Sequence, residues 1–210
     1  MIETVDVTIN DKKYKYSKDV TLLEIYKEHQ TEFKYPIILA RVNNRLKELS
    51  SKIKEDSIVE FIDLTSPEGN RAHVNGLVFM LLYAVKKLYG KTANIMVQHS
   101  LDKGIYIQTS FKLTEEKLEK IKILMKEIVK KDLPITKVTI DRLEAKKYFE
   151  EVGNQTKADT LRYNTDSYVT LYRLGNIYDY FYNQMPPSTA KLKAFDLTYI
   201  KDNGFTLRFP

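Results

Sequence analysis

The stretch VNGLVFMLLYAVKKL, residues 74–88, decides how this chain folds. Its apolar residues recur with the spacing of one face of an α-helix. They are Val74, Leu77, Val78, Leu81, Leu82, Val85 and Leu88. We therefore predict a core helix of about four turns, which the neighbouring segments must cover because its apolar face cannot remain in water.

The residues before this helix predict a small sheet with one short helix. Alternating apolar and polar residues on both sides of Asp11-Lys12 predict a β-hairpin. Thr21 and Glu24 have the spacing of a capping box, which opens a helix. Two further strands are predicted in IILARVNN (37–44), which turns at its end, and in IVEFIDL (58–64). This order, with a short strand between the last two, is that of a ubiquitin-like β-grasp domain.

The polar, turn-rich stretch Ser66–Asn70 predicts a domain boundary. It gives a first domain at residues 1–65 and a second at 70–210. Strands and helices follow one another irregularly in the second domain, so we predict the α+β class for the chain.

Two more helices are predicted after the core helix. Thr114 caps one that runs to about Lys131 before Pro134, and Asp141 caps another that runs to Phe149. The predicted strands are 94–100, 104–111, 135–140, 165–173, 176–182, 194–201 and 204–209. Turns are predicted at Asp102-Lys103-Gly104, Gly175-Asn176 and Asn203-Gly204. A polar connection is predicted at 153–159.

The composition is that of a globular protein with a modest positive charge. Hydrophobic residues make up 43% and charged residues 30% of the 210 residues, and cysteine is absent. Disulfides, cysteine metal ligands and cysteine nucleophiles are therefore excluded. We expect a cytoplasmic protein without membrane contact. Lys plus Arg exceed Asp plus Glu by 34 − 28 = 6, which allows an RNA partner. We favour solvated helix faces as the explanation, because most basic residues lie beside acidic ones.

No catalytic or metal-binding constellation can be assembled from the sequence. Gly90-Lys91-Thr92 imitates the end of a P-loop, but Val85 occupies the position of its first glycine, so we interpret it as a helix end. His29, His73 and His99 have no second histidine one turn away, which argues against a metal site. We predict no catalytic residue, metal or cofactor in this chain.

The aromatic segment at Tyr178, Tyr180, Phe181 and Tyr182 has two interpretations. Aromatic side chains can form a stacking platform for nucleic-acid bases. Alternate aromatics in a strand more often belong to a core, and this is the interpretation that we favour.

The segments LLYAVKKLYG, HSLDKGIYIQ, YRLGNIYD and PPSTAKLKAFDL resemble a known family. Residues 1–64 resemble the TGS domain, the β-grasp module of threonyl-tRNA synthetases. Residues 70–210 resemble the additional domain shared by threonyl- and alanyl-tRNA synthetases, which edits mischarged tRNA. The resemblance covers almost the whole chain and implies the same two folds here.

The positions that carry editing in that family have different residues in this chain. The family has an H-x-x-x-H pair on the core helix and a later C-x-x-x-H pair. These align with Asn75 and Phe79, and with Phe181 and Met185. Phenylalanine cannot coordinate a metal and methionine is a weak ligand, so deacylation by the family route is not expected. The resemblance also implies that Tyr106 and Arg173 flank the site, so we predict a ligand pocket formed by Asn75, Phe79, Tyr106, Arg173, Phe181 and Met185.

A second resemblance is to bacterial uridine kinase-like proteins, which carry the same pair of domains before a P-loop kinase domain of the uridine kinase/phosphoribulokinase class. The phrases EFKYPIILARVNN, EFIDLTSPEGNR and KDNGFTLRFP carry it. It implies a non-catalytic region that binds a ligand, RNA or partner and positions a downstream kinase, an ATP-dependent phosphotransferase that would use ATP and Mg²⁺. The alternatives are a stand-alone tRNA-binding or trans-editing module, inactive in deacylation, and a structural or dimerisation module.

The sequence of the gene beyond Pro210 tests the kinase hypothesis. We expect a G-x-x-x-x-G-K-[ST] motif between a strand and a helix downstream of this chain. The absence of that motif from the gene would refute the hypothesis.

Overall fold

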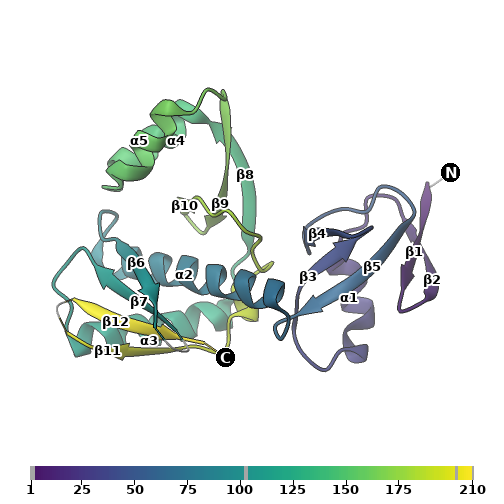
Figure 1. Ribbon diagram of the computed structural model, residues 1–210, viewed down its shortest axis with the longest axis horizontal. Helices are drawn as coiled ribbons and strands as arrows, with labels where there is room; N and C mark the ends of the chain where they lie inside the picture. Colours follow the sequence, from purple (N-terminus) through teal and green to yellow (C-terminus); the bar gives the residue numbers. More distant parts are fainter. Residues whose placement is uncertain (1–2, 102–103, 202, 210) are drawn as a thin grey trace.

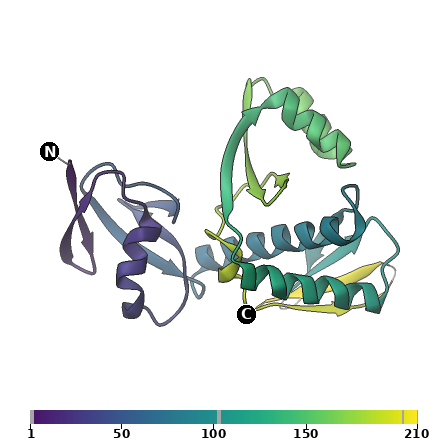
Figure 2. The ribbon, with the colours of Figure 1, turned by 180° about the vertical axis from the view of Figure 1, so that it is seen from behind.

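The computed structural model describes residues 3–101, 104–201 and 203–209 (Figure 1). Within them the chain is a mixed α+β protein with sheets of five, three and four strands. The long helix α2 (Pro67–Tyr89) runs from the five-stranded sheet along the second region, and Figure 2 shows this from behind. No helix in the described part is both long enough and apolar enough to cross a membrane.

The five-stranded sheet has the order β2-β1-β5-β3-β4, in which β1 and β5 are parallel and the other pairs antiparallel. Helix α1 (Leu22–His29) and a short 3₁₀ turn, η1 (Gln30–Glu32), connect β2 to β3. Leu22 of α1 packs with Val7 of β1 in an apolar core. The strands are β1 (Thr4–Ile9), β2 (Lys12–Ser17), β3 (Ile37–Val42), β4 (Arg45–Glu48) and β5 (Ser57–Asp63).

The predicted capping box at the start of α1 is confirmed. The hydroxyl of Thr21 accepts a hydrogen bond from the Glu24 N–H at 3.2 Å, and the Glu24 carboxylate accepts one from the Thr21 N–H at 2.8 Å. These two bonds satisfy donors that a helix N-terminus otherwise leaves free, which explains why a helix of only eight residues forms here.

Helix α2 begins earlier than predicted. The stretch Ser66–Asn70, which we expected to be a turn, supplies the N-cap and first turn of the helix: the Ser66 hydroxyl accepts from the Gly69 N–H at 3.0 Å, and Pro67 occupies the first helical position. A side chain at Gly69 would lie 2.0 Å from the carbonyl oxygen of Asp63, so glycine allows the helix to start directly against the end of β5.

The four-stranded antiparallel sheet, of order β11-β12-β7-β6, supports α2 and α3 (Glu115–Lys131). Ile105 and Ile107 of β7 share an apolar core with both helices. The strands are β6 (Ile95–Ser100), β7 (Gly104–Thr109), β11 (Asp196–Tyr199) and β12 (Gly204–Arg208). The turn predicted at Asp102-Lys103 lies outside the described residues.

The three-stranded antiparallel sheet contains β8 (Ile135–Asp141), β9 (Tyr168–Leu174) and β10 (Ile177–Asp179). Together with α4 (Arg142–Glu151) and α5 (Gln155–Tyr163) it forms what we call the α4–α5 lobe, which rises above α2 in Figure 1. A 3₁₀ turn, η2 (Thr189–Lys191), follows the lobe.

Two predictions in this lobe were wrong. The polar connection predicted at 153–159 is the start of helix α5, whose Asn154 cap accepts from the Lys157 N–H at 3.2 Å and whose Ala158 and Leu161 are buried. The strand predicted at 176–182 ends at Asp179, because its last residues leave the sheet.

Glu48, at the end of β4, joins the five-stranded sheet to the second region. One of its carboxylate oxygens accepts hydrogen bonds from the Tyr172 hydroxyl and from the Met185 N–H, the latter at 3.1 Å. The Lys137 ammonium lies 3.3 Å from the other oxygen. The carboxylate is buried, and burial together with this hydrogen bond raises the pKa of Tyr172. A buried charge with several partners fixes the geometry between the elements that carry them.

Replacement of Glu48 by alanine should therefore destabilise the protein. Glu48→Ala leaves the buried Met185 N–H without its acceptor and the Tyr172 hydroxyl with only the Asn183 carbonyl oxygen, at 3.3 Å, so we expect the free energy of unfolding to fall by about 2–4 kcal/mol in urea titrations followed by circular dichroism. The control is Glu60→Ala, which removes an exposed ion pair with Arg41 and should cost less than about 1 kcal/mol. Equal losses in the two variants would contradict the bridging role of Glu48.

Candidate binding site

Three of the six residues predicted to form a pocket lie together. The rings of Phe79 and Phe181 are 5.3 Å apart, Phe181 also contacts the ring of Tyr172, and Met185 is part of the same apolar core. Phe79 and Met185 are fully buried. At these positions the side chains pack against one another, and none of them lines the cavities that we describe below.

The other three predicted residues are spread over the second region. Asn75 is half-buried on α2, one turn before Phe79, and Arg173 is exposed on β9 opposite Tyr178. Tyr106 lies on the face of the four-stranded sheet that points away from α2 and α3, because its neighbours on β7 point into the core. There its ring is 5.4 Å from that of His99. The structure therefore does not bring Tyr106 to the aromatic contact.

An ion pair between α5 and β10 was missed by the sequence analysis. The Lys157 ammonium of α5 donates to the Asp179 carboxylate at the end of β10. Asp179 is buried and also accepts from the Tyr180 N–H at 2.8 Å. The pair joins α5 to the sheet. The available signal was the Asn154 cap with Ala158 and Leu161 one helical turn apart, which would have predicted α5.

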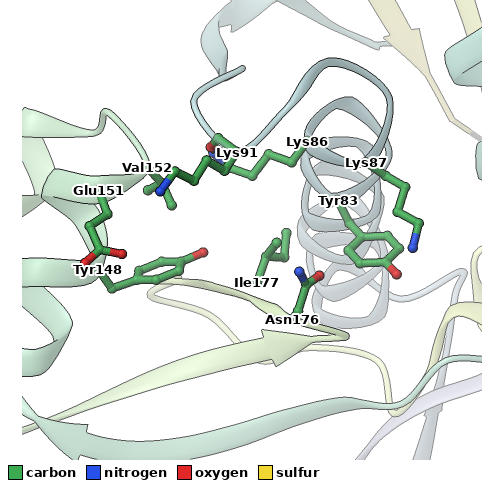
Figure 3. A pocket seen from close by; sticks show the side chains of 9 residues that line it. All are labelled: Tyr83, Lys86, Lys87, Lys91, Tyr148, Glu151, Val152, Asn176 and Ile177. Atoms are coloured by element: carbon green, nitrogen blue, oxygen red, sulfur yellow. The ribbon is translucent and has the colours of Figure 1, made fainter.

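A basic cavity of the second region lies between the C-terminal part of α2 and the α4–α5 lobe (Figure 3). We call it the basic cleft; its volume is about 390 Å³. It is lined by Tyr83, Lys86, Lys87, Lys91, Tyr148, Glu151, Val152, Asn176 and Ile177. These lining residues carry three ammonium groups and one carboxylate, so the cleft has an excess of positive charge and favours an anionic ligand.

Lys86 is the buried cation of the basic cleft. Its ammonium donates to the Lys91 carbonyl oxygen at 2.6 Å and to Asn94 Oδ1 at 2.8 Å. The pKa of Lys86 is lowered to about 8, chiefly by burial; Asp179 acts in the opposite direction and Lys157 in the same direction as burial. An anion in the cleft would stabilise the protonated form.

Two tyrosines form opposite walls of the cleft, as Figure 3 shows. The Tyr148 hydroxyl accepts from the Tyr178 N–H at 2.9 Å, and burial raises the pKa of Tyr148. Tyr83 packs over the β9–β10 turn, where Gly175 has a φ of +58° and a side chain would meet the tyrosine ring at 2.7 Å. Glycine is thus required for the turn to approach α2 this closely.

The described residues contain no cluster of three or more acidic or histidine side chains that could hold a metal ion. The P-loop-like Gly90-Lys91-Thr92 is a helix end as predicted, with Gly90 at the C-cap of α2 and a φ of +95°. The arrangement in the cleft can bind and orient an anion through ammonium and hydroxyl groups.

The aromatic segment at residues 178–182, which begins in β10, divides into two parts. Tyr178 and Phe181 pack against the cores, as we favoured, and the Tyr178 ring lies 5.2 Å from that of Tyr148. Tyr180 and Tyr182 are exposed, and their rings contact each other edge to face at 5.0 Å. The core interpretation is therefore wrong for these two residues.

Over most of its length the chain is similar to threonine–tRNA ligases. It is 31% identical to the protein of Syntrophotalea carbinolica over 166 residues, which cover 78% of this chain and 26% of the relative. For the protein of Carboxydothermus hydrogenoformans the identity is 31% over 196 residues, 91% of this chain and 30% of the relative. For the protein of Symbiobacterium thermophilum the identity is 29% over 201 residues, which cover 94% of this chain and 31% of the relative. No family model matches the chain.

The chain spans less than a third of the length of these relatives. The predicted resemblance to threonyl-tRNA synthetases is confirmed for most of the chain. None of these relatives is a kinase, so the predicted uridine kinase-like parent receives no support from them.

The lowered pKa of Lys86 predicts a pH dependence of stability. The unfolded chain keeps this proton up to the ordinary pKa of 10.5, whereas the folded chain releases it near pH 8. Between these values the unfolded state binds more protons, so the free energy of unfolding rises with pH. We expect a smaller rise in Lys86→Met than in the wild type and in Lys87→Met, which alters an exposed lysine of the same cleft. Urea titrations from pH 8 to pH 10.5 measure this, and identical slopes for all three proteins would contradict it.

Proposed function

We propose that this chain is a tRNA-binding module related to the N-terminal region of threonine–tRNA ligases, and that it does not hydrolyse aminoacyl-tRNA. The similarity to these ligases over most of the chain carries the proposal. The basic cleft supports it, because a cavity with three lysines suits a phosphodiester backbone.

We further propose that residues 1–65 form a TGS-like β-grasp domain and residues 70–210 an editing-like domain. The strand order β2-β1-β5-β3-β4 with one packed helix supports the first assignment. Two large apolar cores support the division, one formed by residues before Ser66 and one by residues after it, and a smaller cluster joins Ala72 of α2 to Ile38, Leu39 and Ile62 across the boundary. In this proposal α2 belongs to the second domain, although its first turn replaces the linker that we had expected.

The absence of deacylation follows from the chemistry of the replaced positions. Phe79 and Phe181 contact each other, and neither can hold a proton, a metal or a nucleophilic water. Lys157 and Asp179, which join α5 to β10, are paired with each other. An aminoacyl ester placed here would meet no general base with a free hydrogen-bonding position among these residues.

In this proposal the basic cleft holds backbone phosphate. Lys87 and Lys91 are exposed, so they can reach a phosphate with little desolvation. Lys86 adds a fixed positive charge behind them. A downstream kinase domain, with its ATP and Mg²⁺, stays a prediction that the relatives do not support.

A binding assay and a deacylation assay test the proposal together. We expect fluorescence anisotropy with labelled threonine tRNA to show binding that weakens with salt. Lys87→Ala and Lys91→Ala should each reduce the slope of log affinity against log salt by about 0.7–0.9, because each lysine displaces a condensed counterion. The control is Lys13→Ala, on the outer strand β2, which should leave the slope unchanged. A mischarged threonine tRNA should lose its amino acid no faster with the protein than without it.

If the protein did not bind tRNA even at low salt, the proposal that this chain is a tRNA-binding module would be refuted. Accelerated deacylation would refute the assignment of a non-catalytic site while leaving tRNA binding in place.

A further inference from the structure

A second cavity lies between the first sheet's helix and the second region. It has a volume of about 670 Å³ and is lined on one side by α1 and the segment after it, and on the other by η2 and its neighbours. We call it the α1 groove. It shares no lining residue with the basic cleft.

The charges of the α1 groove are strongly unbalanced. Four lysines line it, Lys27 and Lys34 from the first region and Lys191 and Lys193 from the second, against one carboxylate, Asp132. The Asp132 carboxylate already accepts from the Ala190 N–H at 3.3 Å. Cations that converge from two separate parts of the chain favour an anionic ligand that contacts both.

Aromatic rings alternate with these lysines. The Tyr35 ring is 43% exposed, and the Lys34 ammonium lies 5.1 Å from its centre. The Lys191 ammonium lies 4.5 Å from the centre of the Tyr26 ring, and Phe33 also lines the groove. Tyr26 is buried, whereas Tyr35 is exposed and Phe33 partly so. Cations next to accessible rings are the combination that binds single-stranded nucleic acid, since phosphates meet the cations and bases stack on the rings.

His73 adds a hydrogen-bonding group without a partner. It lines the groove and is fully buried, and its Nε2 donates to the Ala194 carbonyl oxygen at 3.4 Å. Its Nδ1 has no partner among the described residues. Burial lowers the pKa of His73, so at neutral pH the ring is neutral and Nδ1 is an acceptor. A buried acceptor of this kind is stabilised when a ligand supplies a donor, such as a ribose hydroxyl or a base amino group.

We infer that the α1 groove binds an unpaired segment of RNA, with bases stacked on Tyr35 and Phe33 and phosphates at Lys34 and Lys193. The inference rests on the proposed function in taking tRNA as the partner. It adds a second contact surface, outside the replaced editing positions, for bases that are not paired. The two surfaces would be linked through α2, which passes from the groove at His73 to the cleft at Lys86.

Binding of a short labelled oligouridine, which has no base pairs, tests this inference. We expect Tyr35→Ala to weaken binding about fivefold to a hundredfold, whereas Tyr35→Phe, which keeps the ring, stays near the wild type. The double variant Lys34→Ala/Lys193→Ala should lower the salt slope by about 1.4. All three residues are exposed, so the fold should survive, as circular dichroism can verify. The matched control is Tyr182→Ala, which removes a tyrosine that is 90% exposed and outside the groove.

Unchanged oligouridine affinity in Tyr35→Ala and in the double lysine variant would overturn the inference. So would failure of the wild type to bind oligouridine. If threonine tRNA still binds and responds to Lys87→Ala and Lys91→Ala, the proposed function stands without the groove; if the chain binds no RNA, both fail.

Discussion

The buried carboxylate of Glu48 connects the two regions of the chain by hydrogen bonds, in addition to a small apolar cluster in which Ala72 of α2 packs with Ile38, Leu39 and Ile62 of the first sheet. It comes from the edge strand of the first sheet and accepts hydrogen bonds from Tyr172 and Met185 in the second region. The α1 groove lies between the same two regions, and the aromatic contact of Phe181 lies beside Tyr172. The geometry of both features therefore depends on a charge that is stable inside the protein only while its partners are in place.

The aromatic contact of Phe79 with Phe181 and the ion pair between α5 and β10 both join elements of the second region. The two rings pack against each other and add apolar burial to the core around α2. Lys157 and Asp179 remain charged but are paired with each other, which ties α5 to β10. In the function that we propose, this packing and pairing take the place of groups that catalysis would need free to exchange protons. What remains accessible is positive charge at the ends of α2, and this favours binding over reaction.

The sequence alone was sufficient to predict those structural elements that depend only on residues close together in the chain. The β1–β2 hairpin and the caps at Thr21, Thr114 and Asp141 were predicted because turn residues and capping side chains act within a few residues. Helix α5 was missed because its polar surface hides a narrow buried stripe. The first turn of α2 was missed because Gly69 and Pro67 are turn residues in most contexts. The basic cleft and the α1 groove could not be predicted, since their lysines converge from segments far apart in the chain.

Photocrosslinking tests the central claim, that this fold binds tRNA through positive surfaces at the two ends of α2. Threonine tRNA that carries 4-thiouridine would be irradiated with the protein, and the crosslinked peptides would be identified by mass spectrometry. We predict crosslinks in the peptides that contain Tyr35, Lys87 and Lys91. Crosslinks confined to the β1–β2 hairpin or to the exposed side of α4, with none at the groove or the cleft, would contradict the account.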